Sequence, residues 1–428
     1  MDTIFAQATA PGRAGVSVVR LSGPDAQQIA SQICGPVPDA RLAGLRHVKD
    51  LDGEVIDQAL VLFFSGPNSF TGEDVVEFHL HGSIAVVRAV LNVLGQFPNS
   101  RLAEPGEFTR RALENEKMDL AQIEGLGDLI EAETEAQRKQ AFRVLSGHLG
   151  QRVESWRSDL IRAAALLEAT IDFADEDVPV DVTPEVGSLL SGVHTQIVKE
   201  IKGTKVAERV RSGFEVAIVG APNAGKSTML NALAGRDAAI TSEKAGTTRD
   251  IIEVRMDLGG LPVTLLDTAG LRDSDDDVES IGISRAIERA QNADLRVFLA
   301  SPGDSLMISP FGEDIVVTPK VDLLPASTVG ISGKTGVGVP ELIAQVQSVL
   351  AQRAASVGLA THLRHRKSLE QAAAFLDAAF DVLDRGPDHY DIAAEELRSA
   401  IRALEALVGR IDVENLLDEI FANFCLGK

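Results

Sequence analysis

The sequence predicts a multi-domain protein with an α+β N-terminal domain, a discontinuous helical domain, and an α/β nucleotide-binding domain inserted into the helical one. Short β-branched runs, punctuated by Gly and Pro, fill residues 1–117. Apolar residues recur every three or four positions in residues 118–212 and again in 352–428. Between them, residues 213–351 alternate strand and helix patterns around a phosphate-binding loop, which predicts a doubly wound parallel sheet. Because the two helical segments flank this part, we expect them to pack together.

The composition favours a globular, strongly acidic protein. Its 428 residues contain 41 Lys and Arg against 63 Asp and Glu, a formal charge of −22. Such a charge opposes non-specific binding to a polyanion, so a nucleic-acid partner must meet a local basic patch or be presented by another protein. Two cysteines, Cys34 and Cys425, imply no disulfide framework. With no export signal and no long apolar run, we expect a cytoplasmic protein outside the membrane.

In the N-terminal domain, residues 4–8, 16–21, 59–64 and 75–80 are the expected strands, and residues 86–94 show helical spacing. Composition alone does not choose among its polar candidates for a site. These candidates are Arg20, Glu77, His79, His81 and Lys117.

The first helical segment carries an apolar stripe from Phe142 to Ile171. Basic side chains near it offer an RNA-binding face: Arg138, Lys139, Arg143, Arg152, Arg157 and Arg162. Interleaved carboxylates at Glu135, Glu154, Asp159 and Glu168 favour salt-bridged, solvent-facing positions instead.

Residues 220–227 match the phosphate-loop pattern G-x-x-x-x-G-K-[ST] at every position, between an expected strand at 214–219 and a helix at 226–233. Backbone N–H groups of such a loop surround phosphate oxygens at the helix N-terminus. Lys226 reaches the β- and γ-phosphates, which gives it a catalytic role, and Ser227 ligates Mg²⁺. The expected phosphate-binding residues are Asn223, Ala224, Gly225, Lys226, Ser227 and Thr228.

Two further motifs follow in the order expected of a nucleotide hydrolase. Asp267, Thr268, Ala269 and Gly270 have the D-x-x-G form, in which the Asp holds the Mg²⁺ shell and the Gly N–H meets the γ-phosphate. Residues 246–250 lie between the two loops, and Thr248 is the favoured additional Mg²⁺ ligand.

The base-recognition motif N-K-x-D departs from its pattern, because Pro319 stands where the asparagine belongs. Asp322 still accepts hydrogen bonds from a guanine edge, and Lys320 still lies along the ring. The lost amide costs about 0.5–1.5 kcal/mol per missing hydrogen bond, so we predict that guanine selectivity is kept and affinity is weakened. The segment 332–334 (Ser332, Gly333 and Lys334) then takes the place of the usual S-A-K contact to the base.

Hydrolysis needs a positioned water and neutralised charge in the transition state. Leu271 follows Gly270, so the glutamine that many signalling GTPases use is absent. Carboxylates in residues 273–279 are the alternative, unless they form only a solvated acidic loop.

Together with these motifs, the terminal segment 424–428 (Phe-Cys-Leu-Gly-Lys) resembles that of the MnmE (TrmE) family of bacterial tRNA modification GTPases. The resemblance extends to residues 11–13, 69–74 (Ser-Phe-Thr-Gly-Glu-Asp) and 104–109 (Glu-Pro-Gly-Glu-Phe-Thr), and so spans nearly the whole chain. It implies a folate-binding and dimerising N-terminal domain, a helical domain and an inserted GTPase domain, in agreement with the segments above.

The resemblance also implies a K⁺-stimulated GTPase. Asn223 would ligate K⁺, helped by main-chain groups near Ser242, Lys244 and Thr247. Glu279 matches the family's water-positioning glutamate.

Formyl- or methylene-tetrahydrofolate is the family's one-carbon donor. Arg20, Glu77, Lys117 and Lys428 match the family's folate-binding positions, and Cys425 matches a cysteine proposed to act near the transferred carbon. The family forms homodimers and also a hetero-oligomer with the FAD-dependent protein MnmG. Together they place an aminomethyl or carboxymethylaminomethyl group on carbon five of the wobble uridine of certain tRNAs.

Two other classes of function stay open at this point. A ribosome-assembly or RNA-binding GTPase of the Era or Der kind shares the nucleotide motifs. However, no second phosphate loop and no G-x-x-G loop in a basic setting is evident. A nucleotide-controlled scaffold without N-terminal chemistry is the other alternative. Folate binding to residues 1–117 would distinguish it from a folate-dependent tRNA modification GTPase.

Overall fold

The computed structural model of the chain describes residues 2–172, 181–234, 253–267, 287–301, 303–304, 306, 308–355, 358–411 and 427. The chain divides into two compact units. One consists of residues 1–127 and 405–428, and the other of residues 128–404. The first unit therefore contains both ends of the chain, and the second is inserted within it.

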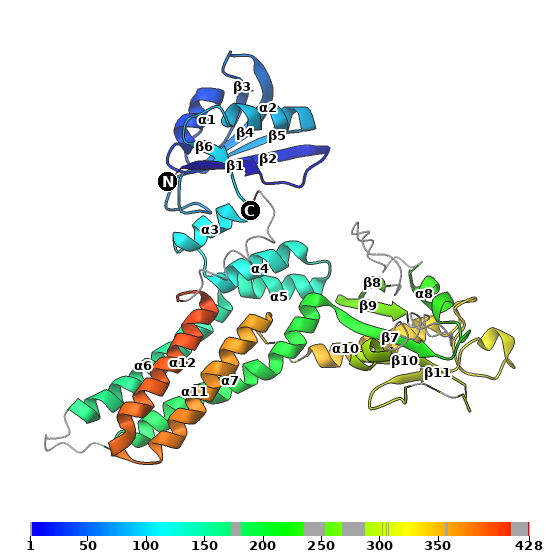
Figure 1. Cartoon of the computed structure of the whole chain (residues 1–428). Helices are drawn as coiled ribbons and strands as arrows, with labels where there is room; N and C mark the ends of the chain where they lie inside the picture. Colours follow the sequence, from blue (N-terminus) through cyan, green and yellow to red (C-terminus); the bar gives the residue numbers. More distant parts are fainter. Residues whose placement is uncertain are drawn as a thin grey trace, which may run out of the picture. The chain divides into compact units, whose positions relative to one another are not determined.

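The first unit is built on a six-stranded sheet with the strand order β3-β4-β5-β2-β1-β6 (Figure 1). The strands are β1 Thr3–Gln7, β2 Ala14–Ser22, β3 Ala43–Lys49, β4 Val55–Phe64, β5 Val75–Gly82 and β6 Ser100–Leu102. Neighbouring strands are antiparallel, except β1 and β6, which are parallel. Helices α1 (Ala26–Cys34) and α2 (Ile84–Leu94) pack with Phe5, Leu21 and Phe78 in the larger core.

A smaller core lies on the other side of β1. There, Ile4 and Ala6 pack with Ala103 and Phe108, and Phe70 lies against them. Phe108 belongs to α3 (Glu107–Glu114). Because strand side chains alternate between faces, β1 contributes Phe5 to one core and its neighbours to the other.

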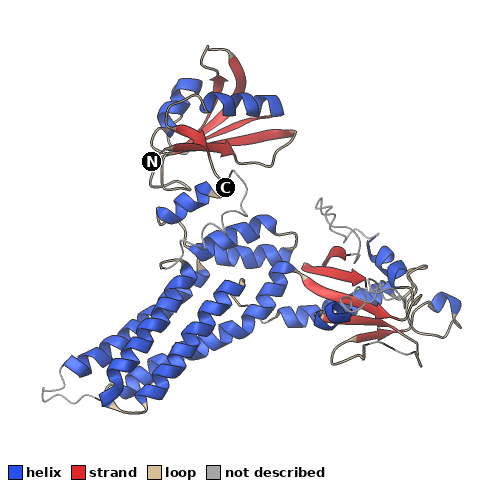
Figure 2. Cartoon of the chain, viewed as in Figure 1, coloured by secondary structure: helices blue, strands red, loops and turns tan. Residues whose placement is uncertain are grey.

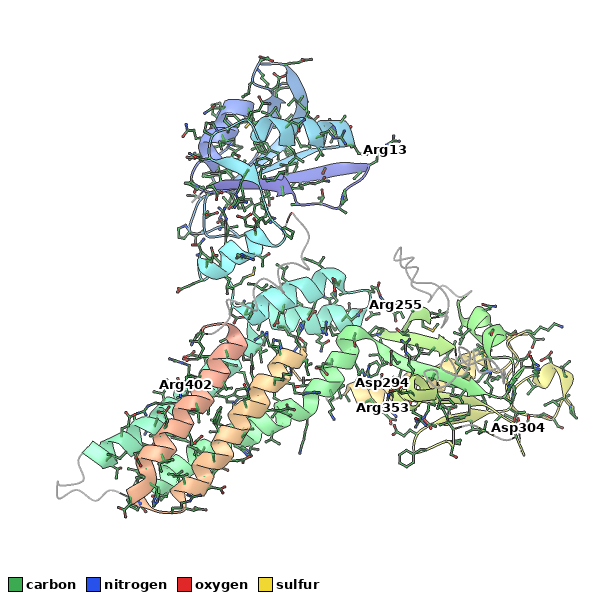
Figure 3. The ribbon with its side chains drawn as sticks, viewed as in Figure 1. Arg13, Arg255, Asp294, Asp304, Arg353 and Arg402 are labelled. Atoms are coloured by element: carbon green, nitrogen blue, oxygen red, sulfur yellow. The ribbon has the colours of Figure 1, made fainter. Side chains whose placement is uncertain are left out.

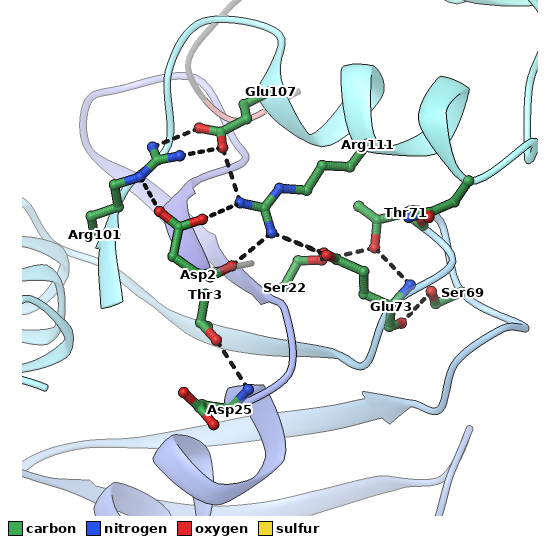
Figure 4. Close-up of polar contacts among 11 residues, drawn as sticks. Asp2, Thr3, Ser22, Asp25, Ser69, Thr71, Glu73, Arg101, Glu107 and Arg111 are labelled. Carbon is green, nitrogen blue, oxygen red and sulfur yellow. Dashed lines mark hydrogen bonds and ion pairs between the residues drawn. The ribbon is translucent and has the colours of Figure 1, made fainter. Parts of the chain in front are cut away.

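The guanidinium of Arg111 on α3 is buried at the centre of a polar network (Figure 4). Its Nη1 lies 3.1 Å from Glu73 Oε1, and its Nη2 donates to Asp2 Oδ1 at 2.9 Å and to Glu107 Oε1 at 3.0 Å. Arg101 donates to both oxygens of Glu107, at 2.6 and 2.8 Å. The stretches 69–74 and 104–109 supply both glutamates, so these stretches hold the smaller core in place.

Burial raises the pKa of the Glu107 carboxyl, but hydrogen bonds from Arg101, the Glu104 N–H and Arg111 outweigh it, so that its pKa lies below the ordinary value of 4.5. The pKa of Asp2 is lowered in the same way, with burial opposed by Arg101 and Arg111. A carboxyl whose pKa is lower in the folded than in the unfolded state stabilises the fold above its unfolded pKa. This stabilisation is lost as the pH falls through the folded value.

The second unit contains a bundle of long helices (Figure 2). The helices of the helical domain are α4 Leu120–Glu131, most of which belongs to the first unit, α5 Glu135–Leu145, α6 His148–Asp172, α7 Thr183–Ser212, α11 Leu363–Leu383 and α12 Tyr390–Val408, whose last residues belong to the first unit. Helices α6, α7, α11 and α12 lie side by side (Figure 1). The Tyr390 hydroxyl lies 2.8 Å from the Thr183 hydroxyl, which joins the two helical segments of the sequence. The predicted discontinuous helical domain is confirmed.

The apolar stripe is less continuous than we predicted. Gly147, at φ 79°, separates α5 from α6, because glycine adopts this left-handed conformation without steric cost. Trp156 and Leu160 are fully buried in the middle of the stripe. Phe142 and Ile171, near its ends, are 54% and 41% exposed.

A five-stranded sheet with the order β11-β10-β7-β9-β8 follows α7. Its elements are β7 Phe214–Gly220, α8 Lys226–Ala234, β8 Glu253–Leu258, β9 Leu261–Asp267, β10 Leu295–Leu299, β11 Ile315–Val317 and α10 Val339–Ala354. Side chains of β7 alternate between two cores: Val216 and Ile218 face the core that includes α8 and α10, and Ala217 and Val219 face the other. The predicted α/β phosphate-loop domain is confirmed.

One edge of this sheet departs from the all-parallel prediction. Strand β8 runs antiparallel to β9, with Leu258 opposite Leu261. Gly259 and Gly260, at φ 62° and 87°, make the two-residue turn that joins them. Parallel neighbours need a long crossover connection, and a two-residue turn is too short for one, so β8 and β9 are antiparallel. The pairs β10–β11, β7–β10 and β7–β9 are parallel.

Asp294, which precedes β10, joins the inserted domain to α7 and also contacts α10 within that domain. Its carboxylate lies 2.8 Å from Arg209 Nε of α7 and accepts the Glu215 N–H at 2.8 Å. Arg353 of α10 donates to its main-chain oxygen, and Figure 3 shows the two residues close together. Burial raises the pKa of this carboxyl. None of the described helices combines the length and apolar content needed to cross a membrane.

Replacing Arg111 by Ala should destabilise the N-terminal unit by about 3–5 kcal/mol, because it leaves the carboxylate of Glu73 without its counter-charge and removes one of the two arginines that pair with the buried Glu107. Urea unfolding at pH 7 measures the loss. The matched control is Arg138→Ala, which removes an exposed pair with Glu135 and should not change the midpoint. Equal midpoints for the two variants would show that the network does not stabilise the fold.

Candidate functional site

The phosphate loop joins the end of β7 to the start of α8. Asn223 and Gly225 have φ values of 64° and 100°, the left-handed conformations that turn the chain into the helix. A Cβ added at Gly220 would come 2.7 Å from the Leu299 carbonyl oxygen of β10, so the loop begins where two strands leave no room for a side chain. The predicted strand, loop and helix are therefore present.

Lys226, the first residue of α8, is buried inside the loop. Its Nζ donates to the main-chain oxygens of Gly220 and Ala221, at 2.9 and 3.1 Å. The ammonium is thus positioned by the backbone that would surround a phosphate. Ser227 and Thr228 follow it on the exposed side of the first helical turn.

A cavity of about 210 Å³ lies between the phosphate loop and two later loops. Its lining combines the predicted phosphate-binding residues Ala224, Gly225 and Thr228 with the predicted base-binding residues Lys320, Asp322, Ser332, Gly333 and Lys334, and includes Pro319, which stands in place of the motif's asparagine. Residues about 100 positions apart in the sequence therefore meet, as a nucleotide with its phosphates and base requires.

Main-chain contacts hold the two base-binding loops together. Val321 N–H donates to the Ile331 oxygen at 3.2 Å, and Ile331 N–H donates to the Thr318 oxygen at 2.8 Å. Lys320 has φ 56°, and its side chain reaches the phosphate loop, because a Cβ added at Gly225 would lie 3.9 Å from Lys320 Cε.

Gly333 occupies the position of the alanine in the usual S-A-K segment. A Cβ added there would lie 3.0 Å from the Met229 main-chain nitrogen on α8, closer than most side-chain contacts. The preceding Ser332 is buried, and its hydroxyl accepts the Thr335 N–H at 3.2 Å. Glycine thus brings the base-binding loop close against the phosphate-binding helix.

Other predicted residues of this site fall largely outside the described part of the chain. Asp267 ends β9 opposite Ile218 of β7, which places its main chain beside the phosphate-loop strand. The others lie outside the described residues: Ser242, Lys244, Thr247, Thr248, Thr268, Ala269, Gly270 and Glu279.

The N-terminal unit carries a second cluster of predicted residues. Arg20 of β2 lies opposite Glu77 of β5 in the sheet register, and its guanidinium lies 2.9 Å from Glu77 Oε1. The same guanidinium carbon lies over the rings of Phe70 and Phe108, 5.1 and 5.6 Å from their centroids. Sequence reasoning missed both rings, although each lies in a stretch, 69–74 or 104–109, that carried the family resemblance.

His79 lies two residues beyond Glu77 on the same face of β5, with Nε2 3.4 Å from Glu77 Oε2. This nitrogen is buried and makes no hydrogen bond to the described residues. A buried nitrogen that makes no hydrogen bond is unusual in a folded protein, so Nε2 keeps the capacity to bond a polar ligand in addition to its approach to Glu77. His81 is instead exposed and bonded to Asp57 at 2.7 Å.

Lys117 and the C-terminal segment approach the same region. A Cβ added at Gly72 would lie 3.0 Å from Lys117 Cε, which places that lysine over the loop after Phe70. Gly427 is buried, and a Cβ added there would overlap the carbonyl oxygen of Gln7 at the end of β1. Cys425 and Lys428 lie outside the described residues.

Replacing Pro319 by Asn should strengthen GDP binding about 2- to 10-fold, because the amide restores one or more hydrogen bonds near the base, each worth about 0.5–1.5 kcal/mol. Calorimetric titration measures the change. The control is Pro325→Asn, which changes an exposed proline outside the cavity lining and should leave the Kd as it is. Unchanged or weaker binding by the first variant would contradict the role assigned to this position.

Residues 3–117 match the family described as GTP-binding protein TrmE N-terminus, and residues 120–425 match the MnmE helical domain. The chain is 69% identical to a tRNA modification GTPase MnmE of Roseobacter denitrificans and 60% identical to one of Ruegeria sp., in both cases over the full length of both chains. A crystal structure of Aquifex aeolicus Era bound to GDP and AlF4− is 28% identical over 31% of this chain and 56% of that one, with a TM-score of 0.26.

Proposed function

The chain belongs to the MnmE family of tRNA modification GTPases, and on that basis we propose that its GTP hydrolysis drives a folate-dependent modification of the tRNA wobble uridine. The product carries an aminomethyl or carboxymethylaminomethyl group on carbon five of that base. The single observation that carries the nucleotide part is the cavity in which Ala224 and Gly225 meet Lys320 and Asp322.

In the nucleotide site, the residues divide the work between binding and hydrolysis. Lys226 is positioned by the carbonyl oxygens of the loop and neutralises charge on the phosphates. Ser227 and Thr248 would hold Mg²⁺, which shields the phosphate oxygens. Asn223 would ligate K⁺ with main-chain groups near Ser242, Lys244 and Thr247. Glu279 would orient the attacking water.

We propose that the N-terminal cluster binds a tetrahydrofolate, whose one-carbon unit becomes part of the new group. The residues present fit such a ligand. Glu77 accepts hydrogen bonds from a pterin edge, Phe70 and Phe108 flank the site, and the buried Nε2 of His79 makes no hydrogen bond to the described residues. Arg20 donates to the Glu77 carboxylate at 2.9 Å and orients it.

The C-terminal segment completes this cluster in our proposal. Gly427 lies against Gln7, and Arg20 is paired in the sheet with Ala6, the residue of β1 that precedes Gln7. In this proposal Lys428 binds the anionic end of the folate and Cys425 serves its one-carbon unit, as the family resemblance implies. The thiol of Cys425 would act there as a catalytic group.

We propose a role for each of the four segments predicted from the sequence. Residues 1–117 bind folate and form the homodimer, 118–212 and 352–428 form the helical domain with the terminal Cys-Leu-Gly-Lys motif, and 213–351 hydrolyse GTP. The partners are tRNA and an FAD-dependent protein of the MnmG kind, in a cytoplasmic hetero-oligomer. An Era- or Der-like role in ribosome assembly has less support, because full-length relatives at 69% and 60% identity are tRNA modification GTPases.

GTP hydrolysis should be at least tenfold faster in KCl than in NaCl, because a correctly sized cation neutralises transition-state charge as an arginine finger does elsewhere. Phosphate release measures the rate. Asn223→Ala should remove most of the K⁺ effect, whereas Asn231→Ala, an exposed asparagine further along α8, should keep it. Equal rates in the two salts would exclude a K⁺-dependent mechanism.

Gly427→Ala should weaken binding of formyl-tetrahydrofolate about tenfold or more and leave GTP hydrolysis unchanged, because the added Cβ collides with the Gln7 carbonyl and displaces the tail. Fluorescence titration of the full chain measures the affinity. The matched control is Gly187→Ala in α7, where no atom lies within 4 Å of the new methyl group. Identical folate affinities for both variants and wild type would show that the tail takes no part in the site.

A further inference from the structure

One face of α7 is strongly basic. Lys199, Lys202 and Lys205 are exposed, and their spacing of three residues places them along one side of the helix over about 9 Å. Arg143 of α5 and Arg152 of α6 lie beside them, and line with Lys199 and Lys202 a cavity of about 700 Å³. We call these five residues the α7 basic surface.

Acidic side chains leave this charge largely uncompensated. Glu200 is the carboxylate that lines the cavity, but it is buried and accepts the N–H groups of Leu359 and Ala360. It lies 3.9 Å from Arg152, the outer limit of an ion pair. Within the described part of the chain, no ion pair is found for Arg143 or for the three lysines.

Most of the basic residues that the sequence analysis named as an RNA-binding face are not part of the α7 basic surface. Arg138 and Lys139 both pair with Glu135, at 2.7 and 3.4 Å. Arg157 lies 3.3 Å from Glu154, and Arg162 lies 2.5 Å from Glu185. For these four, the salt-bridged alternative is confirmed. Of that predicted set, Arg143 and Arg152 belong to the α7 basic surface.

Such a surface is unusual in a chain with a formal charge of −22. Five cations over a short distance repel one another, and an anion that neutralises several of them at once relieves that repulsion. Lysine is depleted at the centres of protein–protein interfaces, whereas Lys and Arg provide the contacts to nucleic-acid phosphates. A nucleic-acid backbone therefore fits this surface better than a protein.

We propose that the α7 basic surface binds the sugar-phosphate backbone of tRNA. This inference rests on the proposed function, which supplies tRNA as the polyanion, and it adds a contact surface in the helical domain. The surface contributes affinity and orientation rather than sequence readout, because phosphates carry no sequence information. It satisfies the requirement that an acidic protein meet a polyanion through a local basic patch.

The test compares two triple variants of the full chain. The first, Lys199→Glu with Lys202→Glu and Lys205→Glu, reverses the surface. The control, Lys49→Glu with Lys367→Glu and Arg385→Glu, makes the same change of net charge at exposed residues elsewhere. Binding of an unmodified tRNA transcript is measured by fluorescence anisotropy between 50 and 200 mM KCl. A third variant, with Ala at positions 199, 202 and 205, guards against misfolding because it preserves helix propensity.

The first variant should lose at least tenfold in tRNA affinity at about 0.1 M salt. Its plot of log affinity against log salt should flatten by about two, since each lost phosphate contact contributes about 0.7–0.9 to the slope. The Ala variant should show a smaller loss in the same direction, the control should bind close to wild type, and all should hydrolyse GTP at the wild-type rate.

Three results would overturn the inference. Equal affinity and salt slope in the first variant and the control would exclude this surface as the tRNA contact. If the wild-type protein bound no tRNA at 50 mM salt, tRNA would be excluded as the ligand of this surface. If the first variant bound tRNA normally but no longer supported tRNA modification in cells, the surface would be assigned to a protein partner. Failure of the proposed function itself is distinguished by a gene-deletion strain that keeps its modified wobble nucleoside.

Discussion

The organisation of the chain depends on one close approach between its ends, where the main chain of Gly427 lies against the Gln7 carbonyl of β1. Only a residue without a Cβ fits this contact. Because of it, both ends of the polypeptide belong to one compact unit, and residues 128–404 are an insertion rather than a domain in tandem. The insertion is therefore connected to the N-terminal unit at two points of the chain.

Local patterns were sufficient to predict much of this structure. The phosphate loop, the four main strands of the N-terminal sheet and the two-part helical domain follow from motif spacing and periodicity, which depend on neighbours in sequence. The same patterns missed β3, an edge strand with few β-branched residues, and the β8–β9 hairpin, whose Gly-Gly turn lies within an otherwise parallel sheet.

The sites required contacts between distant residues. Arg20 and Glu77 were singled out by family resemblance, but Phe70 and Phe108 became visible only when the sheet and α3 brought them beneath the guanidinium. The Arg111 network could not be predicted at all, because its partners come from the chain start and from residues 69–74 and 104–109. Periodicity describes faces of single elements, and it carries no information about which faces meet.

Buried and exposed charged side chains are compensated in different ways. Buried ions such as Arg111 and Glu200 are compensated by several partners each, as the high desolvation cost of a buried charge requires. Most surface cations named in the sequence pair with nearby glutamates, which is expected of an acidic chain. The cluster of basic side chains around α7 differs from these, because no ion pair is found within the described part of the chain for Arg143 or for its three lysines.

In the function that we propose, nucleotide hydrolysis powers wobble-uridine modification. The most direct measurement is the amount of modified wobble nucleoside in tRNA from a strain whose own gene is replaced by wild type or by Lys226→Ala, at equal protein levels. The account predicts full modification with wild type and a loss of at least tenfold with the variant, because Lys226 is held inside the phosphate loop. Full modification by the Lys226→Ala strain would contradict it.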